Sequence, residues 1–282
     1  MKTAKAYSSG RVVLSGEHSV IYGQPAVVAS IDMGTNIQIV EGEINGLSKN
    51  KHFMIFLKTF GKKLNQDISN LDFKINSNLP QKSGLASSSA LAHALIKGLA
   101  KYFNIKLSKD ELFELVLEAE RQIFPASGMD QAAVVYEGLQ QVINNKIETT
   151  VLKNKKFLLI NSGQADEDTA AMVEMVRDKS DKDKIIKKIG KVTKQLIDDL
   201  KKNIFIPELI SENQELLEDL GVVGDRAKTM IRDIKSTGAV AKITGAGGIK
   251  SGSGMLLCYH QDINKLKNLV KNNNWEYYQI SL

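Results

Sequence analysis

The chain has 282 residues, 43% of them hydrophobic and 25% charged, a length and balance typical of a globular protein with one large or two moderate domains. Its apolar runs are too short to span a bilayer, the N-terminus lacks the apolar stretch of a secretory signal, and a single cysteine excludes a disulfide framework. We therefore expect a soluble cytoplasmic protein without a membrane partner, in which Cys258 is a buried thiol and the four scattered histidines form no zinc site.

The net charge of +6 raises the question of a nucleic-acid partner, because clustered lysines neutralise phosphates. Much of the excess lies in residues 179–202, where apolar side chains recur at helical spacing and lysines fill the opposite face. The apolar positions are Ile185, Ile189, Val192, Leu196 and Leu200. This pattern favours a solvated helix face, so we predict no nucleic-acid partner.

The first half of the chain predicts a mixed sheet with helices. Strands are expected at residues 11–14, 26–33, 36–44 and 71–75, and helices at 53–64, 87–102 and 109–121. Ser108 and Glu111 form a capping-box pattern before the third helix. Strands are expected again between residues 132 and 152.

The second half predicts a split βαβ arrangement with additional helices. A strand at 157–161 is followed by several helices to about residue 235, strands at 239–244 and 255–259, a helix at 263–272 and a strand at 275–280. We place the domain boundary near residue 154, in the polar stretch KNKK.

The stretch SGLASSSALAHAL, residues 83–95, puts small residues directly before a predicted helix. A helix N-terminus exposes unpaired N–H groups, so such a turn lets an anion approach closely. Ser87, Ser88 and Ser89 could serve a phosphate or a metal, but ordinary helix capping explains two of them equally well. The stretch alone leaves both interpretations open.

Two further stretches combine glycine with polar side chains. KITGAGGIKSGSG, residues 242–254, joins two predicted strands, and Thr244 and Ile249 stand where a Walker A loop requires glycine. Its glycines allow close approach of a ligand or simply form a connection between strands. GRVVLSGEHSVIYG, residues 10–23, presents Glu17 and His18 at a strand end, where they could bind a hydroxyl or carboxylate or lie in a surface loop.

Together and in this order, the three stretches resemble the three motifs of the GHMP small-molecule kinases. GEHSVIYGQPAVVASID makes the likeness greatest to the mevalonate kinases, and the likeness continues through PQKSGLASSSALAHAL, EAERQIFPASGMDQAAVVYEG, LLINSGQADEDTAAMV, NQELLEDLGVV and KITGAGG. It therefore spans nearly the whole chain.

The resemblance implies an α+β fold with two domains. Residues 1–154 would form the N-terminal ATP- and Mg²⁺-binding domain, similar to domain 2 of ribosomal protein S5. Residues 155–282 would form a ferredoxin-like C-terminal domain, with ATP and substrate in the cleft between the two. The implied reaction is ATP-dependent phosphorylation of the 5-hydroxyl of mevalonate in isoprenoid precursor synthesis.

The resemblance also assigns residues to ATP and to Mg²⁺. The ATP phosphates would lie on the backbone of Gly84, Leu85, Ala86, Ser87, Ser88 and Ser89. The Ser88 hydroxyl and the Glu120 carboxylate would ligate Mg²⁺, an ion that takes hard oxygen ligands and usually only one or two from protein. Because the segment from Glu120 to Asp130 is one residue shorter than the family pattern, Glu118 is the alternative metal ligand.

For catalysis, the resemblance makes Asp130 of SGMDQ the base that accepts the proton of the attacking hydroxyl. Arg11 stands where mevalonate kinases usually have lysine and galactokinases have arginine; its fixed charge would favour ionised Asp130 and the transferring phosphate. Glu17, His18, Thr244 and Gly245 would bind the substrate.

Other readings remain open on the sequence. Arg11 and SGMDQ also suit a sugar or phosphomevalonate kinase of the same superfamily. A catalytically inactive relative that binds a small ligand or nucleic acid would account for the basic surface, although the candidate residues argue against it. Lys250 extends the third motif and is expected to lengthen the loop rather than reach a phosphate. A homodimer is possible.

Overall fold

The computed structural model describes residues 2–44, 46–143, 146–152 and 155–282. They form two compact units, each assembled from separate segments of the chain. The first unit comprises residues 1–10, 32–79 and 86–137, and the second comprises 11–31, 80–85 and 138–282. The expected domain boundary near residue 154 lies outside the described residues and stays a prediction.

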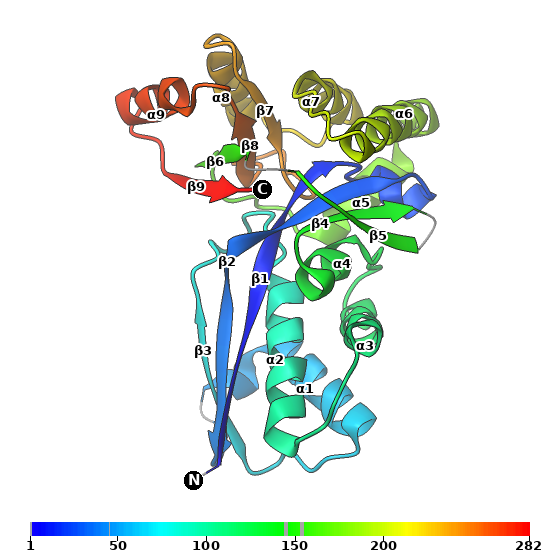
Figure 1. Cartoon of the computed structure of the whole chain (residues 1–282), viewed down its shortest axis with the longest axis vertical. Coiled ribbons are helices and arrows are strands. Elements are labelled where there is room, and N and C mark those ends of the chain that lie inside the picture. Colours follow the sequence, from blue (N-terminus) through cyan, green and yellow to red (C-terminus); the bar gives the residue numbers. More distant parts are fainter. Residues whose placement is uncertain (1, 45, 144–145, 153–154) are drawn as a thin grey trace. The chain divides into compact units, whose positions relative to one another are not determined.

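The first unit is built on the N-terminal part of strand β1 and the C-terminal part of β2 (Figure 1). Its elements are β1 (Thr3–Ser15, to residue 10), β2 (Ala26–Glu41, from residue 32), the 3-10 turn η2 (Leu47–Lys49), α1 (Lys51–Leu64), β3 (Leu71–Ser77), α2 (Ser87–Phe103), α3 (Lys109–Arg121) and α4 (Met129–Tyr136). Strand β3 pairs antiparallel with β2, with Ile37 opposite Ile75 and Ile39 opposite Phe73. The two extended segments expected at 26–33 and 36–44 are therefore one long strand.

Helix α2 lies against this sheet and is buried along most of its length (Figure 1). Gly98 permits the close approach, because a Cβ atom there would lie 2.9 Å from Cδ1 of Ile39. At one edge, the ammonium groups of Lys97 and Lys101 donate to the β1 carbonyls of Tyr7 and Lys5. The helix that begins at Ser87 is thus held rigidly by the core of the first unit.

Local sequence signals specify the start of α3 correctly but misidentify α4. At α3, the Ser108 hydroxyl accepts from the Glu111 N–H and the Glu111 carboxylate accepts from the Ser108 N–H, which confirms the capping box. The strand expected from residue 132 is wrong, since residues 129–136 form α4. Gly128, with φ of +91°, precedes the helix, and buried packing of Ala132, Ala133 and Val134 outweighs the strand preference of the valines.

The second unit contains the remaining parts of β1 and β2 and the C-terminal part of the chain. Its elements are residues 11–15 of β1, η1 (Ser19–Tyr22), residues 26–31 of β2, β4 (Leu139–Ile143), β5 (Lys146–Thr150), β6 (Lys156–Asn161), α5 (Thr169–Asp178), α6 (Lys182–Lys201), α7 (Glu208–Leu220), α8 (Asp225–Lys235), β7 (Val240–Ile243), β8 (Met255–Tyr259), α9 (Ile263–Asn272) and β9 (Tyr277–Ser281). Strands β2, β4 and β5 pair antiparallel.

A second sheet, with strand order β7-β8-β6-β9, carries the C-terminal part of this unit (Figure 1). All its strand pairs are antiparallel, α8 contacts β7 and β8, and α9 contacts β6. Numbered from β6, this order is 2-3-1-4, the ferredoxin-like arrangement expected for the C-terminal residues. The thiol of Cys258 in β8 is buried, also as expected.

Helix α6 has the amphipathic pattern read from the sequence. Its stripe of Ile185, Ile189, Val192, Leu196 and Leu200 is buried, and lysines on the other face, such as Lys187, Lys191 and Lys194, are exposed. Among the helices that the structure describes, none is long and apolar enough to cross a membrane.

Candidate functional site

The N-terminus of α2 is preceded by backbone in unusual conformations. Gly84 has φ of +75°, and Ala86, at the N-cap position, has φ of +57°. Alanine has no polar side chain to cap the helix, so the first-turn N–H groups receive no side-chain cap from that position. This leaves the positive end of the helix dipole available to an anion.

The third serine after this turn bonds to a neighbouring helix. The Ser89 hydroxyl is 1% exposed and donates to Oε2 of Glu120 in α3 over 2.6 Å. Gln131 of α4 donates from its side-chain amide to the same carboxylate oxygen. Helices α2, α3 and α4 therefore meet at the Glu120 carboxylate, to which the Ser89 hydroxyl and the Gln131 amide both donate.

Two buried oxygen atoms in this cluster are available to bind a ligand. Oε1 of Glu120 and the hydroxyl oxygen of Ser88 are both buried, and neither has a hydrogen-bond partner among the residues the structure describes. The Ser88 hydroxyl is close enough to lower the pKa of Glu120, although its geometry is not that of a hydrogen bond. Unpartnered buried oxygens are rare, and a cation would satisfy both.

The charge state of Glu120 is set by opposing effects. Burial raises the pKa of its carboxyl to about 7. Hydrogen bonds from Ser89 and Gln131 and the nearby Ser88 hydroxyl lower this pKa, and the nearby Asp130 charge raises it. A bound cation would favour the ionised form. The hydrogen bonds from Ser89 and Gln131 thus fix the carboxylate, and a cation would supply the charge that keeps it ionised.

The donor set fits Mg²⁺ better than a metal bound entirely by protein. Within the described ranges, no three His, Cys, Asp or Glu side chains come together as a metal-binding group. One hydroxyl and one carboxylate are hard oxygen ligands, and Mg²⁺ commonly takes its remaining ligands from water and substrate phosphates. The alternative ligand, Glu118, instead pairs with Lys63 at 2.8 Å and is about half exposed, at 47%.

In the second unit, the turn before α2 meets the third glycine-rich loop. A Cβ atom on Gly84 would lie 2.1 Å from the Thr244 carbonyl oxygen, and one on Gly245 would lie 2.9 Å from Cα of Gly84. The two backbones touch there, which only glycine permits at this distance and at positive φ. Glycine at positions 84 and 245 thus allows these two backbone segments to pack directly against each other.

Arg11 is bound to the same turn. Its side chain, 4% exposed, donates to the carbonyl of Gly84, and its backbone N–H donates to the carbonyl of Leu85 over 3.1 Å. The side chain expected to act in catalysis therefore also shapes the turn that precedes α2.

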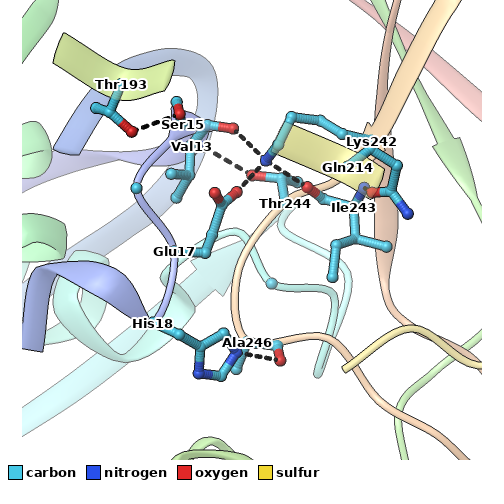
Figure 2. A network of polar contacts seen from close by, with 12 residues as sticks. Val13, Ser15, Glu17, His18, Thr193, Gln214, Lys242, Ile243, Thr244 and Ala246 are labelled. Atoms are coloured by element: carbon cyan, nitrogen blue, oxygen red, sulfur yellow. Dashed lines mark hydrogen bonds and ion pairs between the residues drawn. The ribbon is translucent and has the colours of Figure 1, made fainter. Parts of the chain in front are cut away.

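The third loop is tied to the first motif by polar contacts (Figure 2). Thr244, fully buried, accepts a hydrogen bond at its hydroxyl from the Val13 N–H over 2.7 Å. His18 is 5% exposed, and its Nε2 lies 2.9 Å from the carbonyl oxygen of Ala246. A carbonyl only accepts, so Nε2 carries the proton; burial lowers the pKa of the ring, which leaves Nδ1 as an acceptor.

Glu17 lies in the protein interior and is 1% exposed. Its Oε1 pairs with the ammonium of Lys242, and Oε2 is buried without a hydrogen-bond partner in the described part of the chain. Burial raises the pKa of Glu17, and the Lys242 charge opposes this. Direct substrate contact by Glu17 stays a prediction, and the observed role of its carboxylate is the pair with Lys242.

The structure thus gathers the candidates into two clusters. Within the first unit, Ser88, Ser89, Glu120 and Asp130 converge. Within the second unit lie Arg11, Glu17, His18, Gly84, Leu85, Thr244 and Gly245. Lys250, by contrast, is exposed in the loop.

Sequence reasoning missed Lys242 and Gln131, which hold Glu17 and Glu120. The signal for Lys242 was a lone charge within the apolar strand AVAKIT. The signal for Gln131 was its place next to Asp130 on a buried segment, which required knowing that residues 129–136 are helical.

Comparisons with known proteins identify relatives of the chain. The model of the GHMP kinases N terminal domain matches residues 51–138. A mevalonate kinase of Methanocaldococcus jannaschii is 30% identical, with 94% of each chain covered, and one of Archaeoglobus fulgidus is 30% identical over 86% of this chain and 89% of its own. The crystal structure of the Methanococcus jannaschii mevalonate kinase aligns with a TM-score of 0.83 and 26% identity, covering 99% of this chain and 98% of that one. With this identity over nearly the full length, the chain belongs to the mevalonate kinase family of the GHMP kinases.

Proposed function

We propose that this protein is an ATP-dependent kinase that phosphorylates the 5-hydroxyl of mevalonate to give 5-phosphomevalonate, a step in isoprenoid precursor synthesis. The observation that carries the proposal is the pair of unpartnered buried oxygens, on Ser88 and Glu120, at the N-terminus of α2. They occur in a chain that is 30% identical to a mevalonate kinase over 94% of its length.

The first cluster would serve the nucleotide. Backbone N–H groups in the segment from Gly84 to Ser89 would bind the ATP phosphates, helped by the dipole of α2. Ser88 and Glu120 would hold Mg²⁺, with Ser89 and Gln131 fixing the carboxylate through its other oxygen. When bound, the ion supplies charge neutralisation on the transferring phosphoryl group.

Asp130 would accept the proton of the mevalonate hydroxyl as its oxygen attacks the γ-phosphorus of ATP. It lies in the first turn of α4, close enough to Glu120 to raise the pKa of that carboxyl. Arg11 would add a permanent positive charge, and its hydrogen bond to Gly84 would keep the phosphate-binding turn in place.

The second cluster would serve the acceptor. His18 presents Nδ1 as an acceptor for the substrate hydroxyl, with its ring oriented by the Ala246 carbonyl. Thr244 and Gly245 would line the substrate, and Glu17 would contribute its second carboxylate oxygen. In-line transfer would then depend mainly on positioning.

The test is an ADP-release assay with mevalonate, phosphomevalonate and galactose as separate acceptors. We expect mevalonate to be preferred; a preference for galactose would favour the sugar-kinase reading suggested by Arg11. ATP turnover without dependence on any acceptor, or salt-sensitive nucleic-acid binding without turnover, would support a non-kinase role.

Substituting the proposed base provides the second arm of this test. Asp130→Asn should lower turnover at least ~100-fold, because the amide cannot accept the hydroxyl proton. Arg11→Ala should also lower turnover, and near-native activity of that variant would remove Arg11 from the mechanism. A homodimer and a cytoplasmic location stay predictions.

A further inference from the structure

Strand β7 contains a lysine whose side chain is fully buried, Lys242 (Figure 2). An ammonium group has three N–H donors, and three acceptors surround this one. They are the Val13 carbonyl at 3.2 Å, the Ile243 carbonyl at 2.7 Å and the carboxylate of Glu17. The charge is therefore fully satisfied within the protein.

Stability alone is a poor explanation for such a group. Burying two charges costs desolvation energy that their attraction often only balances, and apolar replacements of a buried pair are frequently neutral or stabilising. Lys242 is 0% exposed and Glu17 is 1% exposed, so both charges carry this desolvation cost. The particular contacts of the ammonium therefore need another reason.

One reason lies in how β7 holds β1. Lys242 and Thr244 are two residues apart, so their side chains leave the strand on the same side. Thr244 accepts from the N–H of Val13, and Lys242 donates to the carbonyl of the same residue. Both backbone polar groups of Val13 are thus fixed by the side chains of Lys242 in β7 and of Thr244, just after that strand, more than 200 positions away in sequence.

The segment that leaves β1 carries this constraint to the first motif. Strand β1 ends at Ser15, and Lys242 also binds Glu17, two residues later. His18 follows with φ of +57°, a conformation that is unfavourable for a residue with a Cβ atom and persists only where its surroundings enforce it. Its ring reaches the Ala246 carbonyl, just beyond Thr244. Lys242 thereby contacts both Val13, within β1, and Glu17, the residue directly before His18.

We propose that Lys242 is a positioning residue for the acceptor substrate, which acts through Glu17 and Val13 to hold His18 against the loop at residues 244–246. The proposal rests on the proposed function. Because Lys242 is buried and its three donors are used, it does not itself contact the substrate. Its loss should weaken acceptor binding much more than ATP binding.

The experiment compares Lys242→Met and Lys242→Gln with the wild-type protein, at a temperature where each variant is folded by circular dichroism. We expect the KM for mevalonate to rise about tenfold or more while the KM for ATP changes less than about twofold, since only the acceptor side loses its alignment. Lys242→Arg, which keeps the charge, should recover part of the mevalonate KM.

A matched control separates positioning from general destabilisation. Leu159→Ala removes a fully buried side chain from β6 and should lower the melting temperature through a cavity, with both KM values unchanged. A mevalonate KM within about twofold of wild type in the folded Lys242→Gln variant would overturn the proposal. Equal increases in the KM for mevalonate and the KM for ATP would also overturn it, if Leu159→Ala showed the same increases at the same loss of stability.

The activity of the wild-type protein distinguishes failure of the positioning proposal from failure of the proposed function. If the wild-type protein does not phosphorylate mevalonate, the proposed function is wrong, whatever the variants do. The same variants are then assayed with the acceptor that the wild-type protein uses, and an unchanged KM for that acceptor overturns the positioning role.

Discussion

Replacing Glu120 by glutamine should stabilise the metal-free protein while removing its response to Mg²⁺. Burial raises the pKa of this carboxyl to about 7 from the ordinary 4.5. The folded state therefore binds a proton more tightly than the unfolded state between these values, and stability falls as pH rises through this window. Above about pH 7 the folded protein carries a buried, ionised carboxylate.

The size of the effect follows from the same values. Each pKa unit corresponds to about 1.4 kcal/mol, so the change from 4.5 to about 7 makes the ionised carboxylate cost about 3 kcal/mol of folding stability. Glutamine does not ionise, and its amide oxygen can take the place of Oε2, which accepts from Ser89 and Gln131. In a chain of this size we expect a melting temperature about 6 °C or more above wild type near pH 8.

The assay is thermal unfolding in the presence of a chelator near pH 8 and near pH 5. The advantage of Glu120→Gln should be largest at the higher pH and nearly absent at the lower one, where the wild-type carboxyl is also neutral. Added Mg²⁺ should stabilise the wild-type protein but not Glu120→Gln. Glu118→Gln, at a half-exposed carboxylate paired with Lys63, is the control and should change little. An advantage of equal size at both pH values, or none near pH 8, would refute this account of Glu120.

Gly84→Ala should weaken ATP binding at least about tenfold, because its Cβ atom would lie 2.1 Å from the Thr244 carbonyl oxygen at a φ of +75°. Gly221→Ala, with φ of +85° and no atom within 4 Å, should cost only backbone strain of about 1 kcal/mol, and equal behaviour of the two variants would exclude the close approach as the cause. Burial lowers the pKa of His93 to about 3 from 6.5, so its contribution to stability is present above about pH 6.5 and is lost as pH falls towards 3. Urea unfolding at several pH values should therefore show a shallower loss in acid for His93→Gln, and an unchanged slope would contradict this.

The sequence by itself determined the features that depend on neighbouring residues. The α3 capping box needs only Ser108 and Glu111, and the apolar stripe of α6 follows from a period of 3.6 residues. The motif order was also sufficient to predict the α+β fold and the kinase family. In each case the decisive pattern is local or simply ordered along the chain.

Local preference was insufficient where packing set the outcome. The valines of residues 129–136 favour a strand, yet the segment is helix α4, because it packs its alanines and Val134 into the core of the first unit. The role of Gln131 depended on that helix. Without it, nothing in the sequence indicated that this amide holds Glu120.

The partners of the buried charges were decided only by the tertiary structure. Glu17 and Lys242 are separated by 225 positions, and Ser89 and Glu120 by 31. No spacing rule links such residues, because their contact results from the packing of whole strands and helices. SGLASSSALAHAL therefore indicated where an anion could bind. The fold determined that Ser88 and Glu120 keep buried oxygens without hydrogen-bond partners among the described residues, and that Ser89 donates to the Glu120 carboxylate and orients it. Desolvation explains why the structure is decisive: a buried charge is tolerated only where the completed fold supplies its partners.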